Sequence, residues 1–98
     1  MNNRQVDYDK LYELILLAKG EHRSVREYVR DGGFSRSLIY MIRDKTLVPG
    51  FKTIFTLTSN RANPQNGITF TQMMWASGYP KEDYEQLKNE LEKLHEYD

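Results

Sequence analysis

Side chains that could carry out catalysis are few in this sequence. The two histidines are His22, beside a basic turn, and His95, three residues after Glu92. Glu92 and His95 would share a helix face and could bind a metal ion, but a third and a fourth ligand are missing. Asp7 and Asp9 are better explained as a helix-start signal than as an acid–base pair. With no cysteine nucleophile and no glycine-rich phosphate loop, we expect a protein that is not an enzyme and uses no cofactor or metal.

Charged residues are unevenly distributed, although 14 basic and 14 acidic residues cancel. Residues 19–52 hold eight Lys and Arg against four Asp and Glu, a balance of +4. Residues 81–98 hold three against seven, a balance of −4. A basic centre beside an acidic end predicts a surface that faces a polyanion next to a segment that repels it. Ordinary solvated charges are the alternative interpretation.

Length and composition favour one small cytoplasmic domain. The chain has 98 residues, of which 39% are hydrophobic and 29% charged. Its longest apolar run, Leu14 to Ala18, is far shorter than the roughly 20 residues of a membrane span. The first five residues lack the apolar stretch of a signal peptide. Without cysteine there are no disulfides, and we expect no membrane contact and no small-molecule substrate.

Cap signals and apolar periodicity predict three helices in the first half of the chain. Apolar residues recur on one helical face over about residues 8–18. Ser24 and Glu27 fit a capping box ahead of a two-turn helix, which a pair of glycines ends. Ser35 is a good cap for a third helix over about 36–44. Two short helices joined by a glycine-containing turn are typical of a helix-turn-helix.

The second half predicts three further helices. Residues 51–58 fit both strand alternation and helical spacing; a lone strand would have no pairing partner, so we expect a helix there. A loop should cover 60–67. Thr69 begins a short helix, and a last helix follows Pro80 over about 81–96. Its narrow apolar stripe either covers the core or pairs with a second chain, and consists of Tyr84, Leu87, Leu91 and Leu94.

The segment from Ser24 to Lys45 resembles the helix-turn-helix of the Cro/C1-type (Xre-like) bacterial and phage regulators. Gly33, Ser35, Ile39 and Ile42 fall on that pattern's turn glycine, cap serine and two core isoleucines. The resemblance extends over about residues 7–79. It departs from the family at Val25, where a glutamine is usual, at Lys45, where glycine is common, and around residues 60–66.

The resemblance implies an all-α fold: a five-helix repressor-like DNA-binding domain (1–79) with an additional acidic C-terminal helix (80–98). The third helix would lie in the DNA major groove, with its outward side chains on base edges and flanking groups on phosphates. The expected base-contacting residues are Arg36, Ser37, Tyr40 and Met41. The expected phosphate-contacting residues are Arg23, Ser24, Arg26, Ser35, Arg43, Lys45, Thr46 and Lys52.

These expectations describe a small transcriptional regulator, most simply a repressor, that binds a double-stranded DNA operator as a homodimer. The alternative is an antitoxin-like or adaptor protein that binds another protein through its acidic end and the face around Trp75. Solvated arginines, or arginines paired with nearby carboxylates, are the plainer interpretation of the basic residues.

Overall fold

The computed structural model describes the backbone of residues 5–96 and the side chains of residues 5–94. These residues form helices and no strand, so the fold is all-α and segment 51–58 is a helix, as predicted. No helix among them is long and apolar enough to cross a bilayer. In chain order the elements are α1 (Tyr8–Lys19), α2 (Val25–Gly32), α3 (Arg36–Arg43), α4 (Phe51–Thr58), the 3-10 helix η1 (Asn60–Ala62), α5 (Phe70–Ala76), the 3-10 helix η2 (Lys81–Asp83) and α6 (Tyr84–Glu96).

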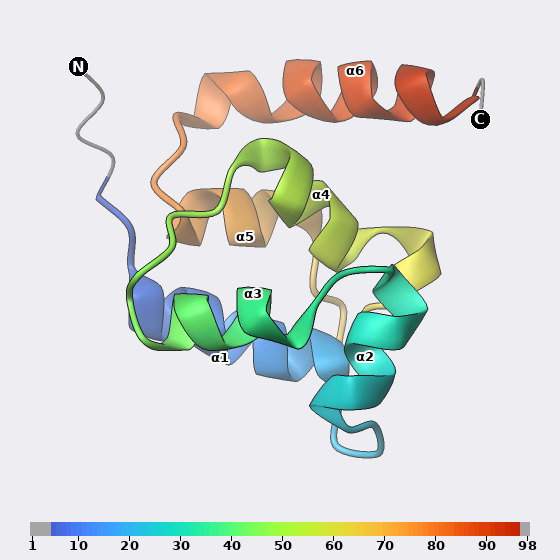
Figure 1. The fold of residues 1–98 in the computed structure, drawn as a ribbon. Coiled ribbons are helices and arrows are strands. Elements are labelled where there is room, and N and C mark those ends of the chain that lie inside the picture. Colours follow the sequence, from blue (N-terminus) through green and yellow to red (C-terminus); the bar gives the residue numbers. More distant parts are fainter. Residues whose placement is uncertain (1–4, 97–98) are drawn as a thin grey trace.

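The helices are stacked in three tiers (Figure 1). Helices α1 and α3 pack side by side in the first tier, α4 and α5 form the second, and α6 lies along the outside of the second. Helix α2 stands at one end, against η1. As a result, α3 and α6 lie on opposite sides of the molecule.

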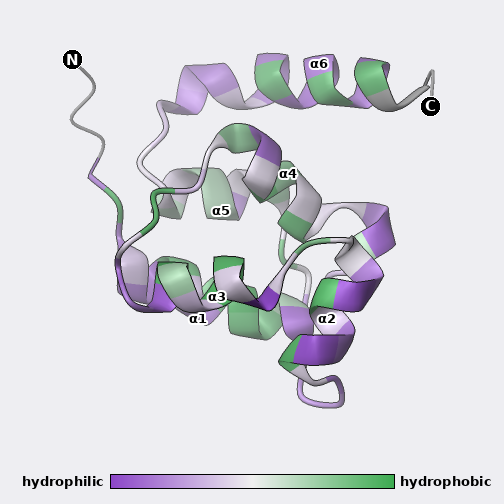
Figure 2. Ribbon diagram, in the orientation of Figure 1, coloured by the Kyte–Doolittle hydropathy of each residue, from purple (hydrophilic) through white to green (hydrophobic). Residues whose placement is uncertain are grey.

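The core fills the space between the tiers with side chains from α1 to α6. Apolar and polar bands alternate along α2 and α6 (Figure 2), as expected for helices with one buried face. Each fully buried aliphatic side chain stabilises the fold by about 1.5–3 kcal/mol. Those with at most 1% of their surface exposed include Leu11, Ile15, Ile39, Ile42, Ile54, Leu57, Met73 and Met74.

The predicted helix starts are confirmed at atomic detail. The Ser24 hydroxyl accepts the Glu27 N–H at 3.0 Å, and the Glu27 carboxylate accepts the Ser24 N–H at 3.0 Å. Thr69 and Gln72 form the same reciprocal box at the start of α5. The Asp7 carboxylate caps α1 through the Lys10 N–H. These local hydrogen bonds satisfy N–H groups that have no partner within the helix.

The turn between α2 and α3 is built around an aromatic pair. Tyr28 is fully buried and donates its hydroxyl to the Leu57 carbonyl at 2.7 Å; burial raises its pKa well above the usual range. The Phe34 ring meets it edge-on, with centroids 5.0 Å apart. Gly32 is the last residue of α2, and this position requires glycine because a β-carbon there would lie 2.0 Å from the Phe34 ring. Gly33 follows with the left-handed φ of 74° that reverses the chain.

Two short stretches differ from the sequence prediction. Segment 60–67, expected as a loop, begins with η1, because the Ser59 hydroxyl caps a tight turn through the Ala62 N–H. Segment 81–96, expected as one helix, begins with the 3-10 turn η2, in which the Asp83 N–H donates to the Pro80 carbonyl. Both are single turns of i to i+3 hydrogen bonds at helix ends.

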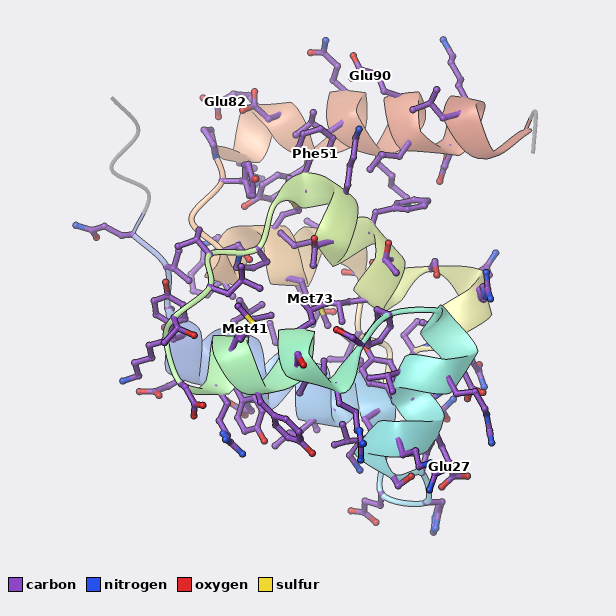
Figure 3. All side chains as sticks on the ribbon, viewed as in Figure 1. Glu27, Met41, Phe51, Met73, Glu82 and Glu90 are labelled. Atoms are coloured by element: carbon purple, nitrogen blue, oxygen red, sulfur yellow. The ribbon has the colours of Figure 1, made fainter. Side chains whose placement is uncertain are left out.

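Helix α6 docks its apolar stripe on α4 and α5. Tyr84 and Leu91 are buried and Leu87 is half-buried, whereas Leu94 is 62% exposed. Figure 3 shows Phe51 of α4 directed into the seam beneath α6. The stripe therefore covers the core; its pairing with a second chain stays a prediction.

Candidate nucleic-acid interface

The outward face of α3 carries the four predicted base-contacting residues. Arg36, Ser37, Tyr40 and Met41 are all exposed. Ile39 and Ile42, on the opposite side of the helix, are fully buried within the tier that α3 shares with α1. The hydrophobic stripe thus fixes which side chains α3 presents to solvent.

Arg36 and Ser37 keep their donors available. Neither side chain has a hydrogen bond or an ion pair within residues 5–94. Ser35 caps the helix by accepting the Leu38 N–H at 3.4 Å, which leaves its own hydroxyl proton free to donate. The first turn of α3 therefore presents a guanidinium and two hydroxyls to solvent.

The second turn holds a cluster that the sequence did not predict. The Arg43 guanidinium stacks over the Tyr40 ring, 4.7 Å from its centroid, and donates to both carboxylate oxygens of Asp44 at 2.9 and 3.3 Å. These hydrogen bonds raise the pKa of Arg43 and lower that of Asp44. Arg43, predicted to contact a phosphate, is exposed and paired with an acidic group that offsets its charge.

Two predicted phosphate contacts at the start of α2 remain exposed. Arg26 has no ion pair among the described residues. The Ser24 hydroxyl proton is free, but its backbone N–H is held by Glu27; that hydrogen bond, the largest influence, lowers the pKa of the Glu27 carboxyl. A phosphate at this helix start would meet an ionised carboxylate beside the two donors.

Arg23 is a structural residue, which contradicts its predicted role as a phosphate contact. Its five N–H groups are all engaged: Nε with Lys19 O, Nη1 with Asp31 and Ala62 O, and Nη2 with Ala18 O and Asn63 O, at 2.7–3.0 Å. The side chain is 12% exposed and stacks on the Tyr28 ring. A guanidinium has five donors, so none is left for a ligand. No local sequence signal marks this role, because two of its acceptors are 39 and 40 residues away.

Two predicted phosphate contacts follow α3. Thr46 uses both of its donors within the fold, whereas the Lys45 side chain stays exposed. The Thr46 N–H and hydroxyl both donate to the Met41 carbonyl, at 2.9 and 3.1 Å, so neither donor is free. Lys45 takes a left-handed φ of 64°. Its exposed ammonium lies 3.7 Å from the Asp9 carboxylate, a weak surface pair.

Lys52 is exposed but is not brought next to α3. It lies in the first turn of α4, which Figure 1 shows beside α6, on the far side of the second tier from α3. A contact from Lys52 would therefore reach a phosphate away from the predicted base-contacting side chains.

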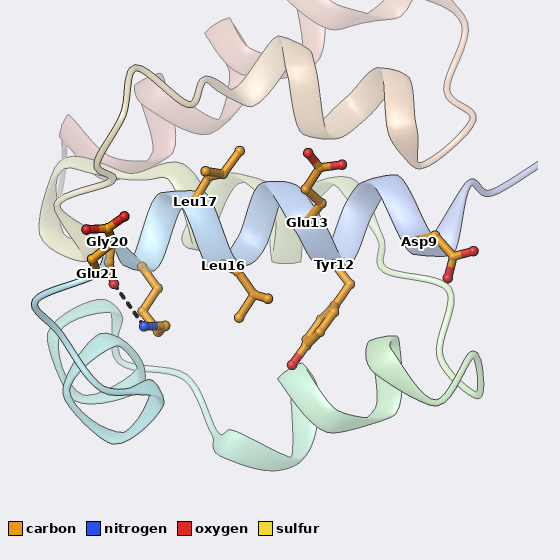
Figure 4. A pocket seen from close by; sticks show the side chains of 8 residues that line it. Asp9, Tyr12, Glu13, Leu16, Leu17, Gly20 and Glu21 are labelled. Atoms are coloured by element: carbon orange, nitrogen blue, oxygen red, sulfur yellow. Dashed lines mark hydrogen bonds between the residues drawn. The ribbon is translucent and has the colours of Figure 1, made fainter.

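One hollow of the described surface, about 500 Å³ in volume, has a mainly polar lining that includes His22, Glu27 and Asp31. A shallow depression of about 470 Å³ runs along α1, and its lining side chains diverge, with Tyr12 and Leu16 directed toward α3 and Glu13 and Leu17 away from it (Figure 4). Within the described part of the chain, no three His, Asp or Glu residues are placed to hold a metal ion. The His95 side chain lies outside the described residues.

Searches of family models, of curated proteins and of solved structures found no match to this chain.

Proposed function

We propose that this protein binds double-stranded DNA sequence-specifically, as a small transcriptional regulator of the Xre type that represses by occupying its operator. Helices α1 to α5 would form a repressor-like DNA-binding domain (1–79), with α3 as the recognition helix and the C-terminal segment 80–98, which contains α6, as an addition to it. The observation that carries the proposal is Arg36: an exposed guanidinium in the first turn of α3, with no partner among the described residues. A guanidinium so placed can bind O6 and N7 of a guanine together.

The surroundings of Arg36 support this proposal. Ser35 and Ser37 offer hydroxyl donors beside it, and Arg26 and Lys45 are exposed cations on neighbouring elements. No carboxylate lies on α3 before Asp44, which follows the helix. A single copy of so small a domain contacts few base pairs, so we propose a homodimer on an operator with two half-sites, in the cytoplasm.

Enrichment of random double-stranded DNA on the purified chain, at about 0.15 M salt, tests the proposal. We expect a recovered palindrome. Arg36→Ala should abolish the preference for that sequence, about 1–3 kcal/mol of discrimination, and leave the thermal unfolding midpoint unchanged. Arg30→Ala, an exposed arginine in the last turn of α2, is the matched control. Equal weakening on all sequences by Arg36→Ala would remove it as a base-reading residue.

Trp75 favours a second candidate function, an antitoxin-like or adaptor protein. It is 65% exposed on α5, and exposed tryptophans are enriched where proteins meet. If random DNA yields no enriched sequence while the fold is intact, this second function becomes the better one. Quenching or shift of Trp75 fluorescence by a candidate partner protein would then measure its binding.

A further inference from the structure

The outward face of α3 lacks the side-chain amide and carboxylate groups that recognise adenine and cytosine by hydrogen bonds. An amide side chain pairs with N6 and N7 of adenine, and a carboxylate accepts from N4 of cytosine. Neither group occurs among residues 36–43. The adjacent carboxylate, Asp44, follows the helix and accepts a hydrogen bond from Arg43 on each of its oxygens. With Arg43 paired to Asp44, α3 presents the Arg36 guanidinium, the hydroxyls of Ser37 and Tyr40, and the apolar surfaces of Tyr40 and Met41.

The two apolar surfaces lie next to each other, one turn after Arg36. Tyr40 is 36% exposed and Met41 is 41% exposed. The Arg43 guanidinium over the Tyr40 ring holds the ring in place. In the major groove, the apolar group that a base edge presents is the C5 methyl group of thymine.

We propose that α3 reads a guanine through Arg36 and a thymine C5 methyl group through Tyr40 and Met41, a refinement that rests on the proposed function. Tyr40 lies four positions after Arg36, which is about 6 Å along the helix axis. Base pairs are stacked about 3.4 Å apart, so the methyl group would lie within a few base pairs of the guanine, at a spacing set by the angle of α3 in the groove. The operator half-site would thus contain both bases.

The test uses the full chain and the duplex recovered by enrichment, with each thymine replaced in turn by uracil, which lacks only the methyl group. At one position per half-site we expect the Kd to rise about fourfold, the effect of one buried methyl group. In Met41→Ala and Tyr40→Ala the ratio of uracil to thymine affinities should move toward one. Tyr40→Phe, which keeps the ring, should retain the wild-type ratio.

The outcomes separate this refinement from DNA binding itself. Binding that is insensitive to uracil at every position, or a uracil effect that persists in both alanine variants, overturns the methyl contact and leaves sequence-specific binding standing. Failure to enrich any sequence overturns both. Thermal unfolding midpoints verify the variants, and Met41→Ala, at a surface position outside the core, decides the test if Tyr40→Ala is unstable.

Discussion

At the scale of single residues, the arginines of this chain differ in whether their N–H groups are already used. All five N–H groups of Arg23 donate to carbonyl or carboxylate oxygens of the fold. Arg43 donates to Asp44, and Arg36 has no partner among the described residues. Charge and sequence position do not distinguish them. Only the acceptors around each guanidinium separate a side chain that maintains the fold from one that can bind a ligand.

Arg23→Lys should lower the free energy of unfolding by about 2–3 kcal/mol. A lysine ammonium has three donors and no planar fork, so acceptors of the network, including the carbonyls of the buried residues Ala18 and Ala62, would lose their partner. Urea denaturation followed by circular dichroism measures the effect. Arg26→Lys, exposed and unpaired among the described residues, should stay within about 0.5 kcal/mol of wild type. Equal loss in both variants would show that the Arg23 network contributes nothing specific.

At the scale of elements, the features that sequence predicted are those set by neighbouring residues. Ser24 with Glu27, and Thr69 with Gln72, are capping boxes whose partners are three residues apart, and both helix starts are confirmed. The engagement of Arg23 and the position of Lys52 beside α6 depend on tertiary packing, which periodicity does not contain. The Arg43 and Asp44 pair is local, yet the pattern of a helix end gives no direction for either side chain.

Lys45→Gly should stabilise the protein by about 1 kcal/mol. Lys45 sits in a left-handed C-terminal turn, where the Lys45 and Thr46 N–H groups donate to the Ile42 and Met41 carbonyls. A β-carbon in that conformation costs roughly 1–2 kcal/mol, and glycine avoids this cost. Thermal unfolding should show a midpoint a few degrees higher. Lys45→Ala keeps the β-carbon and should show no such gain; a gain in that variant would assign the effect to charge.

Leu91→Ala and Leu94→Ala form a matched pair on α6. Leu91 is 4% exposed and Leu94 is 62% exposed. Truncating Leu91 should cost about 2–3 kcal/mol through the cavity that it leaves, and truncating Leu94 less than about 0.5 kcal/mol. Urea denaturation measures both. If Leu94→Ala instead destabilises the protein in a concentration-dependent way, Leu94 is part of a dimer contact.

At the scale of the whole molecule, the tiers separate opposite charges. The structure extends 36 × 33 × 22 Å, and α3 lies on the side opposite α6. Since charges are screened beyond about 8 Å at physiological salt, the carboxylates of α6 should repel a polyanion at α3 only weakly. Lys52, in the first turn of α4, the helix that packs against α6, is the cation whose predicted phosphate contact fits this arrangement least.

Lys52→Ala tests this arrangement directly. If Lys52 contacts a phosphate, the variant should weaken binding evenly across sequences and reduce the slope of log K against log salt by about 0.9. Lys93→Ala, an exposed lysine on α6, should leave the slope unchanged. Filter binding at several salt concentrations gives both slopes. An unchanged slope for Lys52→Ala would remove it from the phosphate-contacting set.

The Arg23 network also bears on the lifetime of the native state. Arg23 donates to the carbonyls of Ala62 and Asn63, which are 39 and 40 residues away in the chain. A neighbouring hydrogen bond, from the Asn66 amide to the Leu17 carbonyl, joins residues 49 apart. Such contacts require a long loop to close first, so we expect them to form after the folding transition state. Arg23 then governs how slowly the protein unfolds and has little influence on how fast it folds.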